Sequence, residues 1–149
     1  RALADWGQRI DKAVYDVRYE EEEEGWTQVD RVLTAAVRWF ADNPDFVRLV
    51  QSENIQRAQY LAQSKTIHQL NASAIDGLRR VLERGQKAGV FRAAIDPVDL
   101  HMSISALSVF NIANRHTFGL IFKRDFESPA AQIARRDSII EMIVRFTRK

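Results

Sequence analysis

The chain of 149 residues contains no cysteine, which excludes disulfide frameworks, thiolate zinc sites and catalysis by a thiol. It also has no run of roughly 18 or more apolar residues, so the sequence predicts no membrane-spanning helix. Its three prolines and six glycines are too few for collagen-like or low-complexity classes. The absence of cysteine fits a reducing compartment, and we expect the protein to be cytoplasmic.

What the chain does contain is typical of a globular domain. Hydrophobic residues make up 46% of the sequence, which excludes disorder, and the length suits one domain over residues 1–149. The net charge of +2 comes with a more basic C-terminal half. This basic excess is too dispersed to predict nucleic-acid binding by these residues. Because Arg1 begins inside a helical pattern, we expect the chain to be a piece of a longer protein.

Four positions predict helix starts. Each proline follows a residue that can cap a helix, in Asn43-Pro44, Asp96-Pro97 and Ser128-Pro129, and Thr27 is a fourth candidate cap. Apolar residues recur with helical spacing after each start, and Gly85 and Gly89 are expected to end the fourth helix. The prediction is an all-α fold of about six helices, over residues 1–18, 27–42, 44–59, 66–87, 97–123 and 129–147.

The helix expected over 97–123 is apolar on two opposite faces. One face begins with Leu100 and Ile104, and the other with Met102 and Ala106. The last helix shows the same property in milder form. Because one domain of this size cannot easily surround such a helix, we expect one face to meet a second copy, giving a four-helix bundle between subunits. A larger monomeric core is the alternative. The expected dimer interface comprises Met102, Ala106, Val109, Ala113, Leu120, Ile139, Ile143 and Phe146.

Two asparagines, Asn111 and Asn114, interrupt an apolar face of the same helix. Buried side-chain amides need hydrogen-bond partners, so they can bond each other, a neighbouring helix or a buried water. Alternatively they orient a ligand, because binding pockets are apolar with a few placed polar groups. The candidate pocket comprises Trp6, Trp39, Tyr60, Gln63, Asn71, Phe110, Asn111, Asn114 and Phe118.

Motifs for catalysis or metal binding do not appear. The three histidines, His68, His101 and His116, form neither an HExxH nor a Glu-x-x-His pattern, and no GxSxG elbow or glycine-rich phosphate loop is present. We therefore expect no enzyme activity, no metal and no cofactor.

Several segments, in their order and spacing, resemble TetR-type transcriptional regulators. The resemblance begins at Arg1-Ala2-Leu3 and covers essentially the whole chain. The segments that carry it are Asn43-Pro44-Asp45-Phe46-Val47-Arg48-Leu49-Val50 with Glu53, residues 83–92 (ERGQKAGVFR), Asp96-Pro97-Val98-Asp99-Leu100, Ile104-Ser105-Ala106-Leu107, the aromatic-rich stretch to Phe122, and the helix from Pro129.

The resemblance implies the effector-binding and dimerisation part of such a regulator, more often a repressor. It implies a homodimer formed by the last two helices and a small-molecule pocket in the helices before them. The three-helix DNA-reading head of the family is not in these residues, so operator binding would need a segment that precedes Arg1. The alternative is a helical module that binds a protein partner and has no small-molecule pocket. The sequence does not indicate which ligand, operator or sign of regulation applies.

Overall fold

The computed structural model describes residues 25–63 and 65–149; the helix expected over 1–18, with Trp6, lies outside them. The described residues form five α-helices and one 3-10 turn. This confirms the all-α class. The elements are α2 (Gly25–Asp42), α3 (Pro44–Ile55), η1 (Leu61–Gln63), α4 (Lys65–Lys87), α5 (Pro97–Phe122) and α6 (Pro129–Thr147).

The capping predictions are confirmed at two of the four starts. The Asp96 carboxylate accepts hydrogen bonds from the backbone N–H of Val98 and Asp99, and the Ser128 hydroxyl accepts from that of Ala131. Asn43 does not cap α3, because its side-chain amide instead donates to the carbonyl of Trp39 at 2.8 Å. Thr27 is not a cap either, since α2 already begins at Gly25.

Two helix ends differ from the prediction for reasons of backbone geometry. Helix α3 ends at Ile55 rather than near 59, because Arg57 and Ala58 adopt positive φ angles that a right-handed helix cannot contain. Gly85 lies inside α4 and does not end it. The chain turns instead at Gly89, whose φ of 72° is one that glycine adopts without steric cost.

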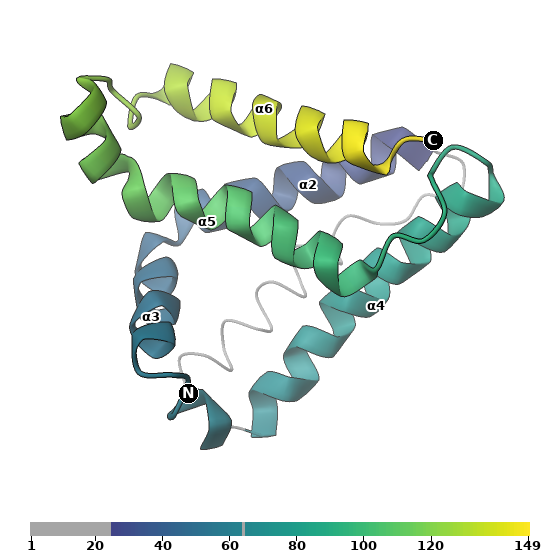
Figure 1. The fold of residues 1–149 in the computed structure, drawn as a ribbon, viewed down its shortest axis with the longest axis horizontal. Coiled ribbons are helices and arrows are strands. Elements are labelled where there is room, and N and C mark those ends of the chain that lie inside the picture. Colours follow the sequence, from purple (N-terminus) through teal and green to yellow (C-terminus); the bar gives the residue numbers. More distant parts are fainter. Residues whose placement is uncertain (1–24, 64) are drawn as a thin grey trace.

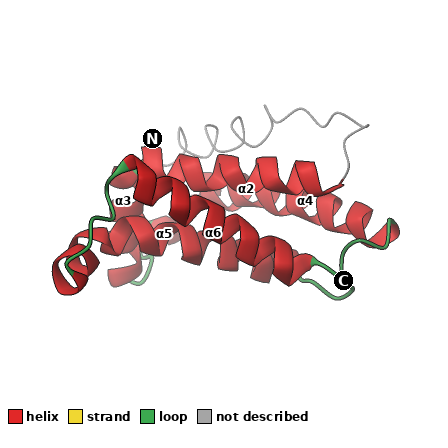
Figure 2. Cartoon of the chain, turned by 90° about the horizontal axis from the view of Figure 1, so that it is seen from above, coloured by secondary structure: helices red, strands yellow, loops and turns green. Residues whose placement is uncertain are grey.

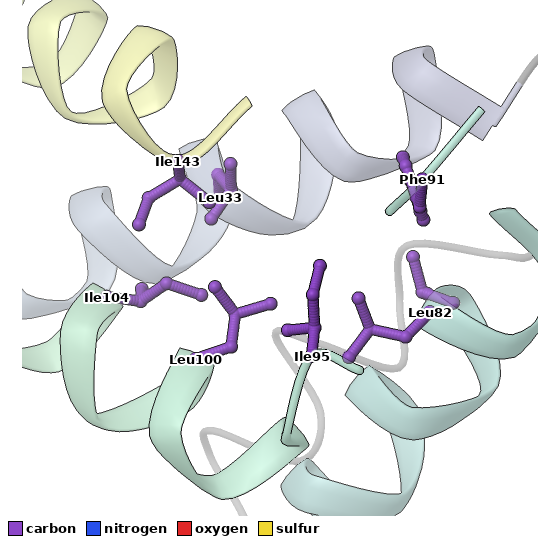
Figure 3. Packing of buried hydrophobic residues seen from close by; sticks show 8 residues of the cluster. Leu33, Leu82, Phe91, Ile95, Leu100, Ile104 and Ile143 are labelled. Atoms are coloured by element: carbon purple, nitrogen blue, oxygen red, sulfur yellow. The ribbon is translucent and has the colours of Figure 1, made fainter. Parts of the chain in front are cut away.

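Helices α5 and α6 run side by side, and α2 passes behind them (Figure 1). Viewed at 90°, α5 and α6 lie on one side of the molecule and α2 on the other (Figure 2). The hydrophobic core lies where α2, α4, the first half of α5 and the end of α6 meet (Figure 3). Its buried residues are Leu33 of α2, Val81 and Leu82 of α4, Phe91 and Ile95 of the following connection, Leu100 and Ile104 of α5, and Ile143 of α6.

Helix α5 faces the core through a row that repeats every four residues. Leu100 and Ile104 are buried as expected, and the row continues through Ser108 and Ile112. Ser108 is a polar residue, yet it is 1% exposed. Its hydroxyl donates to the carbonyl of Ile104 at 2.8 Å, so the helix itself satisfies the polar group and allows its burial.

The C-terminal end of α6 is fastened to the connection between α4 and α5. The backbone N–H of Arg92 donates to the carbonyl of Thr147 at 3.0 Å, and that of Lys149 donates to the carbonyl of Val90 at 3.2 Å. The guanidinium of Arg92 also lies 3.7 Å above the ring of Phe146. These contacts fix the far end of α6 to residues 90–92, in the connection that leads into α5.

Candidate functional site

A cavity of about 480 Å³ opens between the second half of α5 and the first half of α6. Its size falls within the range of small-molecule pockets, roughly 300–1,000 Å³. The connection between the two helices closes its third side. The residues that line it are Phe110, Asn111, Asn114, Arg115 and Phe118 of α5, Arg124 and Phe126 of the connection, and Ala131, Ala134, Arg135 and Ser138 of α6.

Three aromatic rings give the cavity flat apolar surfaces. The rings of Phe110 and Phe118 meet edge to face, with their centroids 5.2 Å apart and an interplanar angle of 89°. Phe118 in turn contacts Phe122 at 5.2 Å. On the opposite wall the guanidinium of Arg124 lies 5.5 Å from the ring centre of Phe126. Such surfaces favour a planar apolar ligand body.

The two asparagines reach the cavity wall with different partners. The side-chain amide of Asn111 donates to the side-chain oxygen of Gln132 on α6 at 3.4 Å, a long hydrogen bond. That of Asn114 donates to the carbonyl of Phe110 in its own helix at 3.1 Å. Gln132 also donates to the carbonyl of Phe126. Asn111 therefore joins α5 to α6 through Gln132, and the two asparagines do not bond each other.

The charge of the cavity is positive, because three arginines line it and none of its lining residues is acidic. Nε of Arg115 is buried and lies 3.1 Å from a carboxylate oxygen of Glu127, but it makes no hydrogen bond in the described part of the chain. The same oxygen lies 3.2 Å from Nδ1 of His116. We treat the Arg115–Glu127 contact as an ion pair without hydrogen-bond geometry. One carboxylate thus compensates one of the three guanidinium charges.

The side chain of Asp125 stabilises the turn between α5 and α6 that closes the cavity. Asp125 accepts hydrogen bonds from the backbone N–H of Glu127 at 2.7 Å and of Ser128 at 3.1 Å. These hydrogen bonds lower the pKa of Asp125, because they stabilise its charged form. Before it, Lys123 takes a left-handed conformation with φ of 51° that ends α5. The turn places Arg124 and Phe126 at the cavity.

Four of the nine expected pocket residues come together here, namely Phe110, Asn111, Asn114 and Phe118. Trp39 instead packs edge to face against Phe40 and Phe46, while Tyr60 and Gln63 are exposed near η1, and none of these three lines this cavity. Trp6 and the side chain of Asn71 lie outside the described part of the molecule.

Sequence reasoning missed the arginines and the α6 wall. The expected pocket did not include Arg115, Arg124, Phe126, Ala131, Ala134, Arg135 or Ser138. A usable signal was present: Asn111 and Asn114 on α5, and Arg135 and Ser138 on α6, are each three residues apart. Polar groups at this spacing share one side of a helix, and a short connection brings two such sides together.

The structure divides the expected dimer interface into two groups. Met102 and Leu120 are 63% and 82% exposed, Ala106 is exposed, and Val109 and Ala113 are half-buried. These five residues follow a spacing of three, four or seven, so they lie along one side of α5; we name this row the α5 outer face. Phe146 is also exposed at 47%, under the Arg92 guanidinium.

Ile139 and Ile143 belong to the core of a single chain, which corrects their assignment to the interface. They are 0% and 3% exposed and present almost no surface to a second molecule. Ile139 and Ile143 face the core, whereas Phe146, in the last turn of α6, is exposed. Met142 of the same helix is instead 39% exposed.

Within the described residues, no group of three or more histidine, aspartate or glutamate side chains is placed to hold a metal ion. The helices there are also too short or too polar to cross a membrane.

Comparison with known proteins identifies the class of this helical domain. Residues 26–143 match the family described as tetracyclin repressor-like, C-terminal domain, so the chain belongs to this family of TetR-type regulators. A relative with an assigned role is the HTH-type transcriptional repressor NicS of Pseudomonas putida, strain KT2440. NicS is 26% identical over 111 residues, which cover 74% of this chain and 52% of NicS. The chain therefore spans about half the length of this curated relative.

Proposed function

We propose that the chain is the effector-binding and dimerisation domain of a cytoplasmic transcriptional repressor. The observation that carries the dimerisation part is the α5 outer face, an apolar row in which Met102, Ala106 and Leu120 are exposed while Val109 and Ala113 are half-buried. Soluble monomers rarely expose a continuous apolar surface of this kind. A second copy related by a two-fold axis would cover the same row on both subunits.

The cavity between α5 and α6 supports the effector-binding part. Its size and aromatic walls are those of a small-molecule site. Family membership and the repressor NicS support the regulatory role. In this proposal the operator is read by a segment outside the 149 residues, since the chain matches only about half of NicS.

The mechanism follows from the position of the cavity in the α5–α6 pair. A ligand changes operator affinity only if it binds one of two arrangements of the dimer more tightly than the other. Couplings of this kind are typically ~1–3 kcal/mol, or about 5- to 150-fold in affinity. Since the proposed interface and the cavity share α5, occupation of the cavity would bias the angle between the subunits. The first helix, outside the described residues, would carry the change toward the operator-reading segment.

Sedimentation equilibrium of the chain tests dimerisation. We expect a dimer of the 17.2 kDa chain. Leu120→Glu should convert it to monomers, because it places charges on both sides of the interface. The matched control is Ile55→Glu, which alters a residue 79% exposed on α3, away from the α5 outer face. A wild-type chain that stays monomeric at high concentration would refute this part of the proposal.

A thermal-shift screen with small molecules separates the regulator from the alternative, a protein-interaction module without a pocket. A ligand that binds only the folded chain raises its melting temperature by mass action. A compound that raises the melting temperature should also change the affinity of the full-length regulator for its operator. The alternative, a protein-interaction module, predicts neither a rise in melting temperature nor a change in operator affinity. A chain that stays monomeric in solution would favour this alternative.

A further inference from the structure

We infer that the cavity between α5 and α6 takes a small anion, with a carboxylate or phosphate head group on a planar apolar body. This inference rests on the proposed function and adds the chemical class of the ligand. It depends on the lining residues alone, which place three cations and three phenylalanine rings around a space of about 480 Å³.

The charge balance of the lining favours an anion. Arg115, Arg124 and Arg135 line the cavity, and no aspartate or glutamate is among its lining residues. Glu127 lies 3.1 Å from Nε of Arg115 and compensates its charge, so Arg124 and Arg135 carry the positive charge of the lining. Arg124 and Arg135 form no ion pair with any carboxylate in the residues that the structure describes. Cations without a paired carboxylate at a concave site favour an incoming negative charge.

The arrangement also fits the shape of such a ligand. Arginine binds carboxylates and phosphates through two parallel N–H groups, so it recognises both head groups with the same geometry. Arg135 and Ser138 lie one helical turn apart on α6 and face Asn111 and Asn114 on α5 across the cavity. The edge-to-face pair of Phe110 and Phe118 offers an aromatic surface for the apolar body.

A matched pair of probes tests the charge requirement. Titration calorimetry of the chain with 2-naphthoate and with neutral 2-naphthamide compares one planar body with and without a negative charge. We expect 2-naphthamide to bind at least about tenfold more weakly, since hydrogen bonds to charged groups contribute more than neutral ones. Naphthyl phosphate then shows which head group is preferred. Equal affinity of the amide and the acid would overturn the inference.

Substitutions locate the site. Arg135→Gln should weaken 2-naphthoate about tenfold or more and leave 2-naphthamide unchanged. The matched control is Arg136→Gln, the next residue of α6, which pairs with Asp137 and does not line the cavity. Ala131→Phe should block both probes by filling the cavity. Circular dichroism melting curves of each variant confirm that it is folded before its affinity is compared.

The results separate this inference from the proposed function. If Arg136→Gln weakens 2-naphthoate as much as Arg135→Gln, or Ala131→Phe leaves its affinity unchanged, the anion site is not this cavity and the inference fails. A neutral compound that binds and alters operator affinity would leave the proposed function standing without it. If none of the anionic probes binds at millimolar concentration, the inference is likewise refuted, whatever the oligomeric state of the chain.

Discussion

The ring of Phe91 lies directly against the backbone of Gly85, in the space that a Cβ atom at Gly85 would occupy. Both residues are buried, and the hydrogen bonds from the N–H groups of Val90 and Phe91 to the Gly85 carbonyl bring the chain back onto α4. The sequence analysis treated this glycine as a helix end. Its place inside α4 instead reflects close packing, which only a residue without a side chain allows.

Gly85→Ala should therefore destabilise the chain although alanine favours helices. The added methyl group overpacks the core at a cost of ~1–3 kcal/mol. The gain in helix propensity, about 1 kcal/mol, offsets only part of this cost. Urea unfolding at a fixed protein concentration measures the difference. A double-mutant cycle with Phe91→Leu serves as control, because a smaller residue at 91 should reduce the penalty of the alanine. An alanine variant as stable as the wild type would show that Phe91 moves aside freely.

Ile139→Ala should lower the free energy of unfolding by ~2–5 kcal/mol, since it leaves a cavity at a fully buried site. The matched control is Ile133→Ala, on the same helix but 51% exposed, and it should cost much less. Chemical denaturation measures both. Under conditions where both variants are folded, neither should change the dimer dissociation constant. A loss of dimerisation in folded Ile139→Ala would instead return Ile139 to the interface.

Asp96→Ala should cost ~0.5–2 kcal/mol of stability, because Asp96 accepts from two backbone N–H groups at 2.8 and 3.0 Å. Ser128→Ala should cost less, since its hydroxyl accepts one hydrogen bond at 3.4 Å. Thermal unfolding of the two variants side by side gives the order. If Ser128→Ala proves the more damaging of the two, hydrogen-bond geometry does not decide the capping energies here.

Acid should weaken the fold through His101. Burial lowers the pKa of His101 below its ordinary value of 6.5, because the charged imidazolium is poorly solvated there. Between the lowered value and 6.5 the unfolded chain binds more protons than the folded chain, so stability rises with pH in this window and is fully present above 6.5. His101→Gln should flatten this dependence.

Denaturant unfolding at several pH values from about 7.5 down to about 5.5 checks this prediction. His116→Gln is the control: it removes an exposed histidine and should retain the acid-dependent loss, because His101 is still present. A pH dependence that survives in His101→Gln and disappears in His116→Gln would contradict the assignment.

The sequence predicted the helices well because proline, capping residues and apolar spacing act locally. The starts of α3, α5 and α6 at Pro44, Pro97 and Pro129 match it. The buried row of α5 was harder to predict. Ser108 looks polar, yet its hydroxyl bonds within the helix and the residue is buried. Whether a small polar residue is buried depends on how the neighbouring helices cross, which helical spacing does not encode.

The candidate site was only half predicted for a similar reason. Phe110, Asn111, Asn114 and Phe118 were found because they share one helix and one face. The other walls depend on the direction in which the connection returns the chain. That direction is determined by the left-handed Lys123 and the hydrogen bonds to Asp125, neither of which carries a strong sequence signal.

The backbone hydrogen bonds of Thr147 and Lys149 with residues 90–92 mean that α5 and α6 are connected at both ends. The connection over residues 123–128 joins them at the cavity end, and residues 90–92 join them at the opposite end. Because α6 is held at both ends, it cannot move away from α5 by rotating about one end alone. A molecule that widens the space between them has to bend α6 or break the backbone hydrogen bond at Thr147, nine residues beyond Ser138 of the cavity wall, so the stiffness of both helices and their connections resists its entry.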